Sequence, residues 1–143
     1  MRKIILASHG SLAEGMKSAV NMILGNTVDI EAFGLDQWGT PQAIQKEVRK
    51  RMSGSDEDEY VILCDVKGGS AYNSMVELVM EPNVSIISGM NLNLVLDLAL
   101  MSPDEKLKDV IEKFMEEARQ GIEFIDASEM NEMKKEEEED ELW

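Results

Sequence analysis

The sequence is poor in the residues that build disulfides, zinc sites and membrane spans. Its 143 residues include one cysteine, Cys64, and one histidine, His9, so an internal disulfide is impossible and a four-ligand zinc site lacks ligands. No apolar run approaches the roughly 18–20 residues that cross a membrane, and no secretory signal is recognised at the N-terminus. We therefore expect a cytoplasmic protein that needs no metal and no cofactor.

Basic residues are also scarce, 14 against 29 acidic ones, which gives a net charge of −15. An acidic domain repels nucleic-acid phosphates, so we expect no nucleic-acid partner. Residues 129–143 concentrate part of the charge, with eight acidic residues and two lysines. We divide the chain into one domain over residues 1–127 and an acidic tail over 128–143, which is expected to be disordered unless Met130 and Met133 extend a helix.

Two common phosphate-binding motifs are missing as well. No G-x-x-x-x-G-K-[ST] segment is present, which argues against a nucleotide-hydrolysing P-loop, and no G-x-G-x-x-G follows the first predicted strand. A phospho-aspartate receiver domain would need acidic residues after that strand to hold Mg²⁺, but Ser8 and His9 stand there. Any phosphoryl group is therefore expected to come from another phosphoprotein.

What the sequence does contain is a regular alternation of short strand-like runs and longer helical ones. Strands are predicted over residues 3–8, 28–33, 60–64 and 84–88, and helices over 12–24, 41–52, 71–80 and 91–101. A loop is expected over 34–39, a capping box at 102–105, a last helix with a buried stripe from Leu107 to Ala118, and a short fifth strand at the sheet edge over 122–125. This order predicts the α/β class, with a doubly wound, mostly parallel four-stranded sheet of order 2-1-3-4 and helices on both faces.

Two of these strands end in residues suited to chemistry. His9 follows the first strand and Asp65 the third, 56 positions later. In the order 2-1-3-4 these strands are neighbours, and the chain reverses direction there, which opens a crevice at their carboxyl ends. A carboxylate bonded to one imidazole nitrogen would fix the tautomer and leave the other nitrogen free to attack.

A glycine-rich turn follows Asp65 directly. Gly68 and Gly69 would allow backbone N–H groups to approach an anion at the start of a helix, and Lys67 and Ser70 could add side-chain donors. Together with His9, these residues suit the acceptance of a phosphoryl group on nitrogen. Plainer interpretations stay open, in which Asp65 is a helix cap, the glycines form an ordinary turn and Lys67 faces solvent.

Three segments of the chain resemble a known family. They are His9-Gly10-x-x-Ala13-Glu14-Gly15, Asp65-x-x-Gly68-Gly69-Ser70-x-x-Asn73 and Ser88-Gly89-Met90-Asn91-Leu92. In order and spacing they are similar to the signatures of the IIA components of the mannose/fructose/sorbose family of the bacterial phosphoenolpyruvate-dependent sugar phosphotransferase system. The resemblance covers about residues 1–125.

The resemblance implies a homodimer, often formed by exchange of the last strand, and a phosphoryl carrier. His9 would take phosphate from the histidine-containing phosphocarrier protein through Nε2, while Asp65 holds Nδ1–H, and would pass it to a histidine of the IIB component. Gly68, Gly69 and Ser70 would bind the phosphoryl group, and Lys67 and Asn73 are further candidates. Sugar would enter through the membrane components IIC and IID.

Two departures and two alternatives accompany this resemblance. Ala71 stands where the family often has proline, and many members continue into a IIB domain, which is here expected to be a separate polypeptide. The same fold would suit the phosphotransfer subunit of a dihydroxyacetone kinase system, and a non-catalytic anion-binding regulatory module is the other alternative. Trp38, in the predicted loop, could lie near the site or at a partner surface.

Overall fold

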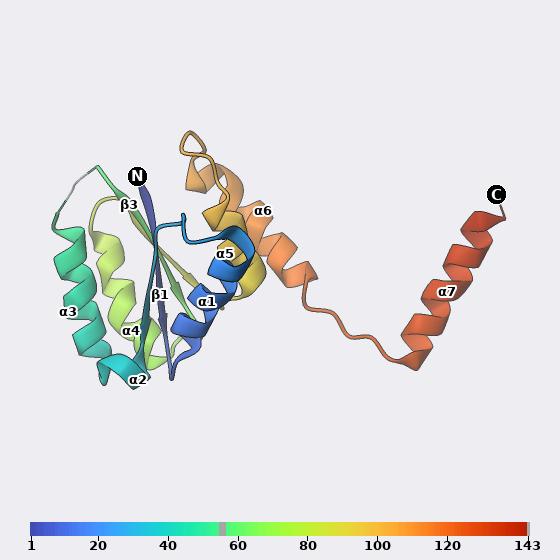
Figure 1. Cartoon of the computed structure of the whole chain (residues 1–143), viewed down its shortest axis with the longest axis horizontal. Helices are drawn as coiled ribbons and strands as arrows, with labels where there is room; N and C mark the ends of the chain where they lie inside the picture. Colours follow the sequence, from blue (N-terminus) through green and yellow to red (C-terminus); the bar gives the residue numbers. More distant parts are fainter. Residues whose placement is uncertain (55–56, 143) are drawn as a thin grey trace.

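The sheet has the order that the sequence predicts. The computed structural model describes residues 1–54 and 57–142. Its strands β1 (Arg2–Ser8), β2 (Ile30–Gly34), β3 (Glu59–Cys64) and β4 (Val84–Ser88) form one four-stranded sheet in the order β2-β1-β3-β4, and every pair is parallel. The α/β doubly wound prediction is therefore confirmed, with β1 and β3 at the centre (Figure 1).

Helices cover both faces of this sheet. Helices α1 (Leu12–Leu24), α5 (Leu92–Ala99) and α6 (Leu107–Gln120) pack on one face, while α2 (Leu35–Trp38), α3 (Pro41–Met52), α4 (Ser70–Met75) and the 3₁₀ turn η1 (Val76–Met80) pack on the other. The remaining helix, α7 (Ala127–Glu141), stands away from the sheet at the end of an extended segment (Figure 1). In the described part of the chain, no helix is long and apolar enough to cross a bilayer.

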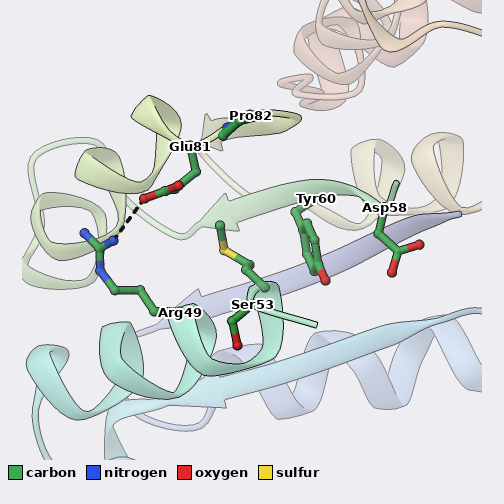
Figure 2. A pocket seen from close by; sticks show the side chains of 7 residues that line it. Arg49, Ser53, Asp58, Tyr60, Glu81 and Pro82 are labelled. Atoms are coloured by element: carbon green, nitrogen blue, oxygen red, sulfur yellow. Dashed lines mark hydrogen bonds and ion pairs between the residues drawn. The ribbon is translucent and has the colours of Figure 1, made fainter. Parts of the chain in front are cut away.

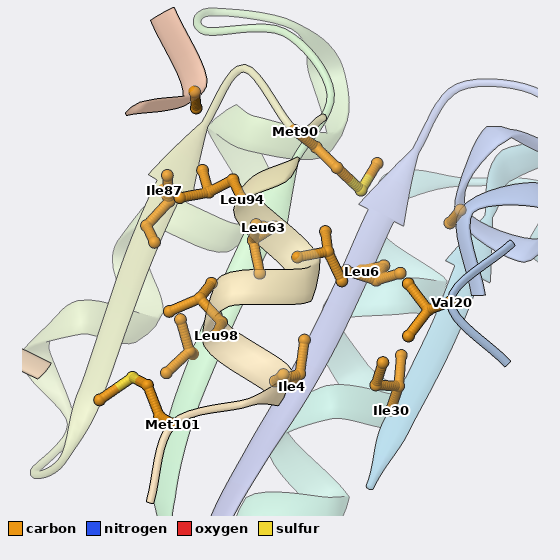
Figure 3. Packing of buried hydrophobic residues seen from close by; sticks show 14 of the residues in the cluster. Ile4, Leu6, Val20, Ile30, Leu63, Ile87, Met90, Leu94, Leu98 and Met101 are labelled. Carbon is orange, nitrogen blue, oxygen red and sulfur yellow. The ribbon is translucent and has the colours of Figure 1, made fainter. Parts of the chain in front are cut away.

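The central strands are apolar on both sides because both of their faces are covered. In β1, Ile4 and Leu6 point to the face of α1 and α5, where they meet Leu94 and Leu98 (Figure 3). Their neighbour Ile5 contributes to the cluster on the opposite face. This double burial fixes the register of β1 and β3, and with it the points at which both strands emerge at the carboxyl edge.

Side-chain caps define where several helices begin. The Oγ atom of Ser8, at the end of β1, accepts the backbone N–H of Ala13 at 2.7 Å inside the core, which anchors α1 to the sheet. Thr40 caps α3 by accepting the N–H of Ala43 at 3.1 Å, and Pro41 stands at the first helical position. Asn91 caps α5 in the same way.

Three local predictions differ from the structure. The loop expected over 34–39 contains the short helix α2, and the helix expected over 71–80 divides into α4 and η1. Near this division the Ser74 hydroxyl donates to the Ala71 carbonyl, a local bond that competes with regular helix formation. The capping box at 102–105 closes a turn instead of opening a helix, because the Arg2 guanidinium donates hydrogen bonds to the backbone carbonyls of Ser102 and Glu105.

The C-terminal segment also differs from the expectation. Residues 122–126 lie outside the sheet and do not form the expected fifth strand. The tail, expected to be disordered, forms helix α7, which Asp126 caps by accepting the N–H of Glu129 at 3.0 Å. Glutamate, lysine and methionine are good helix formers, and an Asp126 cap gives them a defined start. All described residues from 119 to 142 are exposed.

Removal of the Ser8 hydroxyl tests the anchor between β1 and α1. We expect Ser8→Ala to lower the free energy of unfolding by about 1–3 kcal/mol, because the buried N–H of Ala13 loses its acceptor. The exposed cap Thr40 is the matched control, since Thr40→Ala leaves an N–H that water can reach and costs about 1 kcal/mol or less. Urea unfolding of the two variants measures both, and equal losses would contradict the anchoring role of Ser8.

Candidate functional site

His9 and Asp65 meet at the carboxyl edge of the sheet. Strands β1 and β3 lie side by side, with Ala7 opposite Cys64 at their ends, so the next residues of each strand face each other. The Nδ1 atom of His9 lies 2.9 Å from Oδ2 of Asp65, and the same oxygen accepts the backbone N–H of His9 at 2.9 Å. The other oxygen, Oδ1, accepts the N–H of Val66 at 3.0 Å. The carboxylate is thus fixed by three hydrogen bonds.

The two side chains differ sharply in their access to solvent. The His9 side chain is 51% exposed, whereas that of Asp65 is 6% exposed. The imidazole therefore lies at the surface, while the acid lies behind it. A visiting protein can reach the imidazole without displacing the carboxylate.

The electrostatics of the pair favour an ionised acid. Burial by itself raises the pKa of Asp65, but the backbone and side-chain hydrogen bonds from His9 outweigh burial and bring that pKa below its ordinary value. At neutral pH the carboxylate is charged and accepts a hydrogen bond from Nδ1–H of His9. In the tautomer that results, Nε2 is the unprotonated nitrogen.

Ser70 completes the near surroundings of the imidazole. Its hydroxyl oxygen lies 3.2 Å from Nε2 of His9, at the first residue of α4. With Nδ1 protonated, this hydroxyl donates to Nε2. At the neighbouring position, a Cβ atom on Gly69 would lie 3.0 Å from Cε1 of His9, so a side chain there would crowd the imidazole.

The turn between Asp65 and α4 is built more by internal bonds than the sequence suggests. The N–H of Gly69 donates to the Val66 carbonyl at 3.2 Å, so it is not free to bind an anion. Gly68 adopts a left-handed φ of 78°, and its carbonyl accepts the side-chain amide of Asn73 at 3.1 Å. Asn73 therefore braces the turn.

Other residues named from the sequence take simpler places. Lys67 is exposed. Trp38, the last residue of α2, packs on Phe33 with ring centroids 5.3 Å apart, so it is a partly buried residue at the border of the core. Cys64 is fully buried, and burial followed by the charge of Asp65 raises the pKa of its thiol to about 12. Within residues 1–54 and 57–142, no cluster of histidine, cysteine or acidic side chains is placed to hold a metal ion.

Two hollows lie in different parts of the surface, and only one of them shares residues with the predicted site. A pocket of about 220 Å³ near the start of β3 has Tyr60 in its wall and the ion pair of Arg49 and Glu81 on its rim (Figure 2). It contains no residue predicted for the site. A second hollow of about 390 Å³ lies between α3 and α4 and is lined in part by Ser70 and Asn73, so it shares two residues with the predicted site.

One connection at the site escaped the sequence reasoning. Glu14, noticed only as part of a motif, accepts the N–H of Gly34 from the end of β2 at 2.8 Å. An acidic residue in the first turn of the helix after the histidine was the available signal, but its partner lies 20 positions away on another strand.

Comparisons with known proteins agree with this geometry. The model of the family "PTS system fructose IIA component" matches residues 3–115. The sorbose-specific EIIA component of Klebsiella pneumoniae is 33% identical over 95 residues, which cover 66% of this chain and 70% of that protein.

Solved structures show the same architecture. The phosphotransferase system component EIIA from Streptococcus agalactiae superposes with a TM-score of 0.74 at 22% identity, covering 90% of this chain and 98% of that one. The mannose/sorbose-specific IIA subunit from Enterococcus faecalis gives a TM-score of 0.71 at 25% identity, over 87% and 95%. Because the family model spans more than three quarters of the sequence, the protein belongs to the mannose/fructose/sorbose family of IIA components of the sugar phosphotransferase system.

Proposed function

We propose that His9 is the phosphoryl acceptor of this IIA component. It takes the group from the phosphohistidine of the carrier protein and gives it to a histidine of the IIB component. The observation that supports this most directly is the ring of His9, which is bonded through Nδ1 to a buried carboxylate at 2.9 Å and has a side chain that is 51% exposed. A buried or unpaired imidazole would not suit exchange between proteins.

The transfer needs no general base in addition to His9 and Asp65. The Nε2 lone pair attacks phosphorus, a new N–P bond forms, the N–P bond of the donor breaks, and the donor imidazole leaves with the bonding electrons. Positive charge develops on the His9 ring, and the Asp65 carboxylate beside Nδ1–H stabilises it. Transfer to IIB is the same exchange in reverse.

We propose that Ser70 binds the phosphoryl group once it is on His9. Its hydroxyl must leave Nε2 when the N–P bond forms, and from the start of α4 it can then donate to a phosphoryl oxygen. The turn of Gly68 and Gly69 keeps the space beside the ring free of side chains. Lys67 is proposed as an outer donor, whereas Asn73 supports the turn through the Gly68 carbonyl.

The assignment to sugar uptake follows from the relatives. Those matched by sequence are named as sorbose- and fructose-specific EIIA components, which supports a transporter with membrane components IIC and IID over a dihydroxyacetone kinase system. This family membership also supports exchange with the carrier protein in the cytoplasm.

We further propose a homodimer in which residues 122–125 pair with β4 of a second copy. β4 is an edge strand that pairs only with β3 in the described sheet. The chain after α6 carries Ile122 and Phe124, whose side chains are 82% and 76% exposed. Apolar side chains on an extended segment beside an open sheet edge favour strand addition.

Substitution of His9 tests the central proposal. Incubation of the wild-type protein with phosphoenolpyruvate, the first enzyme of the system and the carrier protein should add one acid-labile phosphate, measured by intact mass. His9→Ala should add none, because it is the only imidazole in the chain. Ser11→Ala, on the same loop, is the control and should be labelled normally. Labelling of His9→Ala would show that the acceptor lies elsewhere.

Substitution of Asp65 tests the role of the carboxylate. We expect Asp65→Ala and Asp65→Asn to fold and to slow transfer by up to about 100-fold, the scale of a misplaced reacting group. Because the pKa of Asp65 is lowered in the folded state, its ionised form stabilises the fold above the unfolded pKa of about 3.9, and that contribution is lost as pH falls through the folded pKa. The stability gap between wild type and Asp65→Asn should therefore narrow below about pH 4. A wild-type transfer rate in both variants would rule out the orienting role.

Chain length tests the dimer and the tail together. Sedimentation of chains ending at residues 143, 126 and 120 should give dimer, dimer and monomer, because the second lacks only α7 and the third also lacks residues 121–126. Circular dichroism should show that all three are folded. A dimer of the shortest chain, or a monomer of the full one, would contradict strand exchange.

A further inference from the structure

Three segments that are distant in sequence meet beside His9. They are the turn after β1, the first turn of α1 and the end of β2. Glu14 of α1 accepts the N–H of Gly34 at 2.8 Å, and the carbonyl of Gly10 accepts the N–H of Asp36 at 3.2 Å. The residue that follows His9 is thus tied to the β2 side of the molecule.

The contact between these segments leaves no room for a side chain. A Cβ atom at Gly34 would overlap both the Glu14 carboxylate and the Gly10 carbonyl. Gly34 itself has φ −92° and ψ 145°, which any residue adopts, so glycine is required here for space alone. Gly10, in contrast, has a left-handed φ of 50°, so the turn after His9 has a special backbone shape that its surroundings must hold.

Glu14 lies at the centre of this contact in an environment that does not favour a charge. Its Oε2 atom is buried and makes no hydrogen bond within the described part of the chain. The first turn of α1 offsets part of the desolvation cost, because the helix N-terminus favours a carboxylate. The contact to Gly34 gives this carboxylate a role that a surface glutamate could not fill.

We propose that Glu14 is a positioning residue for phosphoryl transfer, which fixes the turn of His9 and Gly10 from the β2 side while Asp65 fixes the imidazole from the β3 side. This inference rests on the proposed function of His9. Two anchors on opposite sides then hold the backbone turn and the ring in place. The role of Glu14 is geometric: its reach to Gly34 matters, and its charge does not, because Asp65 already supplies the carboxylate that faces the ring.

Reach and charge can be separated by three substitutions. Glu14→Gln keeps the length and an oxygen for the Gly34 N–H, Glu14→Asp keeps the charge but is one methylene shorter, and Glu14→Ala removes both. The matched control is Glu105→Ala, because Glu105 also accepts one backbone N–H, that of Ser102 at 2.9 Å, in a turn far from His9.

We expect Glu14→Ala and Glu14→Asp to lower kcat for transfer from the carrier protein by about tenfold or more, in line with the cost of misplaced reacting groups, with KM within about twofold. Glu14→Gln and Glu105→Ala should stay close to the wild-type rate. If Glu14→Ala does not fold, the comparison of Glu14→Gln with Glu14→Asp decides alone. Equal rates for these two, or a slow Glu14→Gln beside a normal Glu14→Asp, would overturn the proposal.

A spectroscopic measurement keeps this test separate from the proposed function. The ¹⁵N and Nδ1–H resonances of the single imidazole report its tautomer and its bond to Asp65 without any donor protein. We expect them to shift in Glu14→Asp and to be unchanged in Glu14→Gln. If the wild-type protein accepts no phosphate, the proposed function fails while these spectra still test Glu14. Unchanged spectra in Glu14→Asp would refute the positioning role whatever the transfer assay gives.

Discussion

The hydrogen bond between Nδ1 of His9 and the Asp65 carboxylate decides what the rest of the molecule can do. It sets the tautomer, orients the half-exposed ring, and places a charge beside the imidazole, which the proposed transfer would make positive. The bond exists because β1 and β3 are neighbours in a parallel sheet that is buried on both faces. The core of the domain thus acts on the chemistry through the register of two strands.

Around this pair, the structure puts different demands on different loops. The turn of Gly68 and Gly69 must be thin, since a side chain at Gly69 would meet the imidazole, and it is held by its own hydrogen bonds and by Asn73. The turn at Gly10 must be held in a left-handed shape from the β2 side. The site is therefore largely made of fixed backbone. Such a site suits the proposed transfer of a phosphoryl group, which needs positioned groups more than a base.

Topology and the principal pair could be predicted from sequence because they depend on patterns of period and on strand ends. The alternation of runs gives the sheet order, and the order brings His9 and Asp65 together across 56 positions. The helix caps at Thr40 and Asn91 are local and could be read in the same way. These features need only neighbouring residues and the handedness of the crossovers.

What could not be predicted depends on contacts between distant segments. The turn at 102–105 is set by Arg2, about 100 positions away, and the bond from Gly34 to Glu14 needs the end of β2 to be placed against α1. From the sequence, the N–H of Gly69 could bind an anion, but in the fold it donates to the Val66 carbonyl within the turn. A helix in the tail was only the alternative to disorder because the segment has no apolar face, although its cap and its composition favour helix formation.

The buried Cys64 gives the molecule an internal reporter. It is the only thiol, it is the last residue of the strand that precedes Asp65, and its pKa near 12 keeps it protonated and unreactive in the folded state. Alkylation at mildly alkaline pH can therefore proceed only when β3 opens. The labelling rate of this one sulfur atom then measures how often β3 opens behind the imidazole. It does so in the wild-type protein, without an introduced probe.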